Sequence, residues 1–159
     1  MNDHNFTTSF TVDRTPDAVF AAINNVRGWW SQNVSGPTDK AGEAFDYRYR
    51  DLHRCRIRVV ELVPGRKVAW HVEHNHFSFT SDDTEWTGTD IVFDIAERDG
   101  KTEVRFTHVG LVPDYECYDV CSDGWGTYIE GSLRSLIVSG EGQPNVGEPM
   151  NASERSLAS

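Results

Sequence analysis

The chain has 159 residues, the size of one ordinary domain and enough to bury a core without disulfide or metal support. Fifteen basic and 25 acidic residues give a formal charge of −10, which opposes nonspecific binding to nucleic acid or to anionic membranes. No run of about 18 apolar residues occurs, so no membrane-inserted helix is predicted.

The N-terminal part predicts one strand followed by two short helices. Phenylalanine and valine alternate with threonine and serine within 5–12, a pattern typical of an edge strand. Thr15 suits the N-cap of a helix and Pro16 suits its first position, so a helix is expected from residue 16 to about residue 24. A second short helical turn is expected around 26–31.

From Gly42 onward the pattern has a period of two, which is typical of half-buried antiparallel strands. Pro64-Gly65 predicts one turn between strands, and Asp99-Gly100 predicts a tight hairpin. Together with the first strand this makes six strands. The apolar faces of the five later strands carry Phe45, Tyr47 and Tyr49; Cys55, Ile57 and Val59; Val68, Trp70 and Val72; Ile91, Phe93 and Ile95; and Val104 and Phe106.

The last predicted element is a long amphipathic helix from about residue 115 to residue 139, which Gly140 ends. Glycines within it weaken a helix, so close packing is expected at Gly124, Gly126 and Gly131. One domain is expected over 5–144. The polar residues 145–159 show no periodicity and are predicted to form a mobile tail.

Several short motifs follow one another in a recognisable order: Phe10-Thr11-Val12, Thr15-Pro16-Asp17-Ala18-Val19-Phe20, Trp29-Trp30, Glu61-Leu62-Val63-Pro64-Gly65-Arg66, Trp86-Thr87-Gly88-Thr89, Phe106-Thr107-His108-Val109-Gly110-Leu111, Gly124-Trp125 and Ser132-Leu133. Their order and spacing resemble the activator of Hsp90 ATPase homologue-like (AHSA1-like) branch of the START/Bet v 1-like (SRPBCC) superfamily. The resemblance implies an α+β helix-grip fold: a curved six-stranded antiparallel sheet wrapped around a long C-terminal helix, with two short helices after the first strand and a hydrophobic cavity between sheet and helix. It implies no single activity, because members bind lipids, hormones or polyketides and some are cyclases or hydrolases.

The side chains that would line this cavity follow from the alternation along each strand. If Trp70 faces the helix, His74 and His76 continue that face, provided that no bulge interrupts the strand. By the same argument, His108 points inward with Phe106. A mostly apolar concavity with a few polar groups is typical of a small-molecule site. The predicted ligand-binding residues are Trp30, Phe45, Tyr47, Trp70, His74, His76, Trp86, Phe93, Phe106, His108, Trp125 and Tyr128.

No metal, cofactor or catalytic residue is predicted. His74 and His76 are too few to bind a metal, and the three cysteines at 55, 117 and 121 follow no recognised zinc spacing. They are interpreted as reduced thiols, which together with a start that lacks a leader pattern favours a cytoplasmic location. There is no Gly-x-Ser-x-Gly elbow, so the sequence does not indicate a serine nucleophile. Cyclase- or hydrolase-type chemistry in the cavity, with His108 as general base, stays an alternative.

Two surface features also allow two interpretations each. Five arginines fall within eleven residues and are expected on the outer face of one hairpin: Arg48, Arg50, Arg54, Arg56 and Arg58. They would bind an acidic protein, as in a chaperone cofactor, or would pair with acids such as Asp90 and Asp94. Trp29-Trp30 and the connection 75–88 would form a lid over the cavity mouth or would plug the open ends of the grip.

Overall fold

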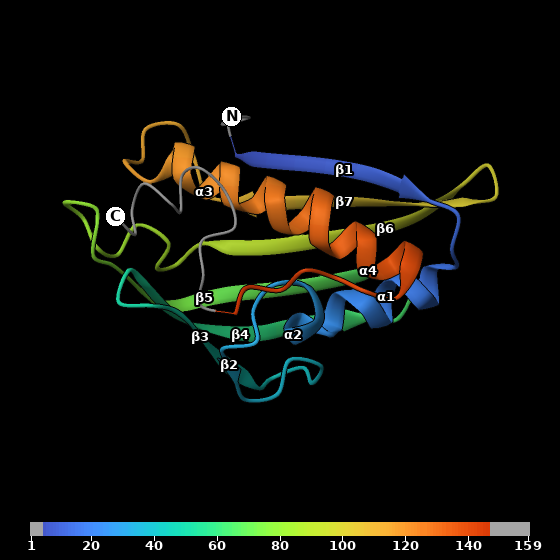
Figure 1. Ribbon diagram of the computed structural model, residues 1–159, viewed down its shortest axis with the longest axis horizontal. Coiled ribbons are helices and arrows are strands. Elements are labelled where there is room, and N and C mark those ends of the chain that lie inside the picture. The colour runs from blue at the N-terminus through green and yellow to red at the C-terminus, as the bar shows by residue number, and fades with distance from the viewer. Residues whose placement is uncertain (1–4, 147–159) are drawn as a thin grey trace.

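The computed structural model describes residues 5–146 and consists of one antiparallel sheet with helices on one face (Figure 1). The strands follow the order β1-β7-β6-β5-β4-β3-β2. Their bounds are β1 Phe6–Val12, β2 Val34–Ser35, β3 Ala44–Tyr49, β4 His53–Val63, β5 Lys67–Phe77, β6 Asp90–Arg98 and β7 Lys101–Val109. The predicted α+β helix-grip fold is confirmed, with seven strands in place of six. The additional strand, β2, has two residues, which is too short for an alternation to be visible in the sequence.

The C-terminal helix lies across the sheet in three consecutive segments (Figure 1): α3 Tyr118–Trp125, η1 Gly126–Leu133 and α4 Arg134–Ser139. The middle segment, η1, is a π-helix, a wider coil with hydrogen bonds between residues five apart. The expected close packing at the glycines is wrong, because a Cβ atom added at Gly124 or Gly131 would meet nothing within 4 Å. Gly140, with φ of 84°, ends the helix as predicted.

The two short helices pack beside the later part of the C-terminal helix, the first against α4 and the second against η1 (Figure 1). The first, α1 Pro16–Asn24, is capped by the Thr15 hydroxyl, which accepts a hydrogen bond of 3.1 Å from the backbone N–H of Ala18. The second, α2 Val26–Trp29, is a single turn. Among the described residues, no helix is both long enough and apolar enough to cross a membrane.

A bulge in β5 decides which side chains enter the grip. Val72 lies opposite Ile57 and His74 lies opposite Arg56, so Glu73 is an extra residue without a partner on β4. The insertion reverses the alternation: Asn75 and Phe77 are buried, while His74 is exposed and His76 is half-buried beside it. The prediction that His74 and His76 face the helix is therefore wrong, because it assumed an uninterrupted strand.

The segment that follows the C-terminal helix returns to the body of the domain. The side-chain amide of Asn145 donates to the Tyr128 hydroxyl at 3.0 Å, and its backbone N–H donates to the carbonyl oxygen of Trp30 at 2.8 Å. Asn145 is 1% exposed. The first residue of the predicted tail is thus part of the packed domain, and residues 147–159 lie outside the described part of the chain.

Candidate functional site

The space between sheet and helix is filled by aromatic rings at the end near α1 and α2. Trp29 and Trp30 lie parallel to Trp70, with ring centroids 6.4 and 6.2 Å away. Phe45 and Phe93 present their edges to the same indole at 5.3 and 5.1 Å. None of these five side chains is more than 2% exposed. We call this group the filled end. Its tryptophans are buried, so they plug the grip and do not form a lid.

The opposite end, beneath α3, contains a cavity of about 60 Å³. Four of its lining residues, Tyr47, Trp86, Trp125 and Tyr128, were predicted from the sequence. Water takes up about 30 Å³ per molecule in the liquid, so the cavity has room for about two waters. The complete lining consists of Tyr47, Tyr49, Leu52, His53, Phe77, Phe79, Trp86, Val120, Cys121, Gly124, Trp125 and Tyr128. We call it the hollow end, and it contains no Asp, Glu, Lys or Arg.

Trp125 contacts both ends of the grip. Its ring lies 5.0 Å from that of Trp30 and stacks on Trp86 at 5.5 Å with an interplanar angle of 10°. Phe106 contacts the same indole at 4.7 Å, on the side of the filled end. Of the predicted ligand-binding residues, Trp30, Phe45, Trp70, Phe93 and Phe106 therefore belong to the solid core and not to the cavity wall.

His108 is buried beside Trp125 and uses both of its ring nitrogens. The Trp125 indole N–H can only donate, so Nδ1 of His108 accepts this hydrogen bond, at 3.0 Å. The Thr89 hydroxyl donates to the carbonyl oxygen of Trp86, so its oxygen accepts from Nε2 of His108 at 2.8 Å. Burial lowers the pKa of His108 to about 3 and keeps it neutral. No ring nitrogen is left to act as a base, so His108 is a hydrogen-bonded core residue.

His53 is the polar residue of the cavity that the sequence analysis missed. Its Nε2 lies 2.7 Å from the side-chain oxygen of Asn75. The Asn75 amide nitrogen donates to the backbone carbonyl of Asp83 at 3.4 Å, so its oxygen must accept from His53. Nε2 therefore carries the proton. Burial lowers the pKa of His53 to about 3, so Nδ1 is unprotonated and available as an acceptor.

The sequence contained the signal for part of this missed wall. Tyr49 continues the inward alternation of Phe45 and Tyr47, and His53 precedes Cys55 and Ile57 on the same face of β4. Phe77 points inward only because of the bulge at Glu73. Leu52 and Phe79 come from irregular connections, where periodicity gives no direction.

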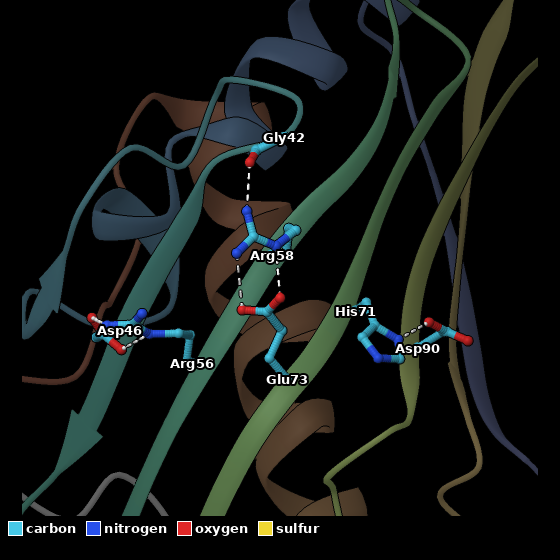
Figure 2. Close-up of polar contacts among 7 residues, drawn as sticks. All are labelled: Gly42, Asp46, Arg56, Arg58, His71, Glu73 and Asp90. Carbon is cyan, nitrogen blue, oxygen red and sulfur yellow. Dashed lines mark hydrogen bonds and ion pairs between the residues drawn. The ribbon is translucent and has the colours of Figure 1, made fainter.

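His71, His74 and His76 lie outside the grip. Nδ1 of His71 is 2.8 Å from a carboxylate oxygen of Asp90, as Figure 2 shows, and Nδ1 of His76 is 3.1 Å from Asp83. His74 is exposed opposite Arg56. Within the described range 5–146, no group of three or more His, Cys, Asp or Glu side chains is placed to bind a metal ion.

Among the clustered arginines, Arg48, Arg56 and Arg58 pair with acids on the outer face of the sheet. Arg58 binds both carboxylate oxygens of Glu73, at 2.7 and 3.2 Å, and Arg56 binds those of Asp46 at 3.1 and 3.2 Å (Figure 2). Arg48 pairs with Asp51 at 2.6 Å.

Pairing with acids was expected, but the partners are not Asp90 and Asp94. The hydrogen bonds from Arg58 hold the pKa of Glu73 below its usual value. Arg50 lies over the Tyr49 ring at 5.9 Å, and Arg54 is exposed on β4. Most of the positive charge is thus balanced within the domain.

The cysteines are buried thiols. The hydrogen bond with Cys121 and burial raise the pKa of Cys117, and burial raises the pKa of Cys55 well above its usual value. A thiol must ionise to attack a substrate, so Cys55 and Cys117 are poor nucleophiles.

The connection 78–89 is anchored to the start of the C-terminal helix by Glu85. Its carboxylate accepts hydrogen bonds from the backbone N–H groups of Glu116 at 2.9 Å and of Cys117 at 3.1 Å. Glu85 is 8% exposed. Because Trp86 follows it directly, this contact holds one wall of the cavity in place.

A family model described as activator of Hsp90 ATPase homolog 1-like protein matches residues 13–137. The chain is 22% identical to the Aha1 dimer from Colwellia psychrerythraea, with a TM-score of 0.69 over 87% of this chain and 98% of that one. Protein MLL2253 from Mesorhizobium loti is 14% identical, with a TM-score of 0.63 over 83% of this chain and 96% of that one.

CalU16 from Micromonospora echinospora is 12% identical, with a TM-score of 0.61 over 85% of this chain and 76% of that one. At these identities the solved structures show the fold alone. No curated protein sequence matches the chain. The family model, however, covers most of the domain, from the first helix to the last. The chain therefore belongs to the family of activator of Hsp90 ATPase homolog 1-like proteins, as the resemblance of its motifs predicted.

Proposed function

We propose that this protein binds a small, uncharged apolar or amphipathic molecule at the hollow end of the grip. The observation that carries the proposal is the cavity of about 60 Å³ beneath α3, which is walled by aromatic rings and includes the ring of His53. An apolar concavity with a few polar groups is the usual form of a small-molecule site. His53 takes the orienting role that the sequence analysis gave to His74, His76 and His108.

The size of the cavity sets what can enter. A cavity of about 150 Å³ in another protein takes up benzene, so a space of about 60 Å³ holds only one end of a ligand. Leu52, Phe79 and Val120 are half-buried members of the lining, so we take them as the mouth through which the rest of the molecule would extend. These come from two connections and one helix, so a larger ligand would have to displace them.

Charge and redox state support the same proposal. An ion in this cavity would lose its hydration without gaining a charged partner, because the lining contains none, so the ligand is uncharged. The three buried thiols are consistent with a reducing compartment, and we propose the cytoplasm as the location.

The proposal can be tested by filling the cavity with a larger side chain. Gly124 lines the cavity and Gly131 is exposed further along the same helix, and a Cβ atom would meet nothing within 4 Å at either position. We expect small neutral amphiphiles to raise the melting temperature of the wild type and of Gly131→Leu, but not that of Gly124→Leu. Extraction of natively purified protein for mass spectrometry would identify a resident ligand. A screen in which no compound stabilises the wild type, or in which Gly124→Leu responds equally, would contradict the proposal.

A further inference from the structure

Two polar atoms at the hollow end have no hydrogen-bond partner among residues 5–146. One is Nδ1 of His53, whose other nitrogen is used by Asn75. The second is the indole nitrogen of Trp86, which is buried. An unsatisfied buried donor such as the Trp86 indole nitrogen is costly, and in native proteins it usually has an explanation, such as a bound molecule.

The two atoms are complementary and belong to adjacent rings. The rings of His53 and Trp86 meet edge to face, with centroids 4.6 Å apart, and both line the cavity. Unprotonated Nδ1 can only accept a hydrogen bond, whereas an indole N–H can only donate one. A hydroxyl group both donates and accepts, so it can satisfy the two atoms together. An ether oxygen could satisfy only the indole.

We infer that the cavity selects neutral ligands that carry a hydroxyl group, which donates to Nδ1 of His53 and accepts from the indole N–H of Trp86. This inference rests on the proposed function and narrows it to alcohols with a short apolar body. Carboxylates and amines are disfavoured, since both are charged at neutral pH and the lining has no charged side chain to pair with them.

Trp70 supplies a matched control. Its indole nitrogen is also buried without a partner, but Trp70 belongs to the filled end and does not line the cavity. If an unpartnered indole were only an imperfection of the core, the two tryptophans would respond alike to a ligand. If the cavity binds a hydroxyl, only Trp86 responds.

The test compares three probes of similar size: 1-butanol, methyl propyl ether and butyrate. Each is titrated into ¹⁵N-labelled protein at pH 7, and the indole N–H signals are assigned with Trp86→Phe and Trp70→Phe. We expect 1-butanol to bind about two- to tenfold more tightly than the ether, the range for one additional hydrogen bond, and butyrate not to bind. The indole proton of Trp86 should move downfield with 1-butanol while that of Trp70 stays in place.

His53→Phe separates the roles of the two atoms, because it keeps a ring but removes the acceptor. The preference for 1-butanol over the ether should fall to about one in this variant and should persist in Trp70→Phe. Equal binding of alcohol and ether by the wild type, or a preference unchanged in His53→Phe, would overturn the inference and leave the proposed function standing. If none of the probes perturbs any cavity signal, the proposed function fails as well. Should His53→Phe not fold, the wild-type preference and the Trp86 signal still decide.

Discussion

The two buried histidines of this domain differ in how completely their surroundings use them. At His108 both ring nitrogens have partners, Trp125 and Thr89, and the neighbouring space is filled by aromatic rings. At His53 one nitrogen is used by Asn75 and the ring borders a cavity. The pKa of each is lowered to about 3 by burial, so the difference lies in packing and not in charge.

The comparison shows how the aromatic side chains between the sheet and the C-terminal helix can stabilise the fold at one end and leave space for a ligand at the other. The filled end behaves as an ordinary close-packed core, in which each ring loses contacts if a neighbour is removed. The hollow end borders a cavity instead, and its wall includes side chains from two connections and from the glycine-containing helix α3. Trp125 contacts both ends, and Tyr47 of the cavity lining stacks directly on Trp30 of the filled end at 4.2 Å.

Truncating one ring at each end should give the largest difference. Trp70→Ala removes a fully buried ring from the filled end and should lower the free energy of unfolding by about 3–5 kcal/mol. Phe79→Ala, at the half-buried mouth, should cost about 1–2 kcal/mol. Chemical denaturation measures both, and equal losses would mean that the two ends are packed alike.

Acidification should destabilise the fold through both histidines. Their folded-state pKa values of about 3 lie below the value of about 6.5 in the unfolded chain, so the unfolded state binds more protons between these limits. The free energy of unfolding should therefore fall as the pH is lowered from about 6.5 toward 3, by up to about 1.4 kcal/mol per pH unit for each histidine.

The variant His53→Gln isolates one of these contributions. Its stability should decline less steeply with acid than that of the wild type. Denaturant melts at several pH values provide the measurement. Parallel slopes for wild type and His53→Gln would show that His53 is not buried in its neutral form.

The anchor at Glu85 should matter at the hollow end in particular. Glu85→Ala leaves the backbone N–H groups of Glu116 and Cys117 without an acceptor, which should cost about 1–3 kcal/mol. Hydrogen exchange should become faster in the connection 78–89 but not around Trp70. Glu97→Ala, at an exposed position on β6, is the matched control and should change neither quantity.

The smallest expected effect is a gain in stability. Gly124→Ala and Gly131→Ala each add a methyl group where nothing lies within 4 Å, and alanine favours a helix over glycine by up to about 1 kcal/mol. Thermal melts should show a similar increase for both. A loss of stability in Gly124→Ala alone would mean that the cavity mouth is narrower than described.

The sequence was sufficient to predict the fold but not the boundary between the two ends. Element order, turns and motifs predicted the grip, and the inward alternation correctly placed Phe93, Phe106 and His108 in the core. Whether inward-facing rings fill a space or surround one depends on their volumes and positions in three dimensions. Period-two patterns contain no such information.

Specific local features account for the remaining errors. The bulge at Glu73 turned His74 and His76 outward, and a single extra residue in a strand leaves no clear mark on a charged, histidine-rich stretch. His53 was overlooked because it lies among arginines, although its parity with Cys55 indicated the inner face. The π-helix η1 could not be foreseen from residues that also fit an α-helix.

Xenon tests the central claim most directly, because it binds apolar cavities and needs no knowledge of the natural ligand. Crystals pressurised with xenon should show a strong peak among Phe77, Trp125 and Tyr128, and none at the filled end around Trp70. Absence of a peak beneath α3, or a peak beside Trp70, would contradict the division of the grip into a filled and a hollow end.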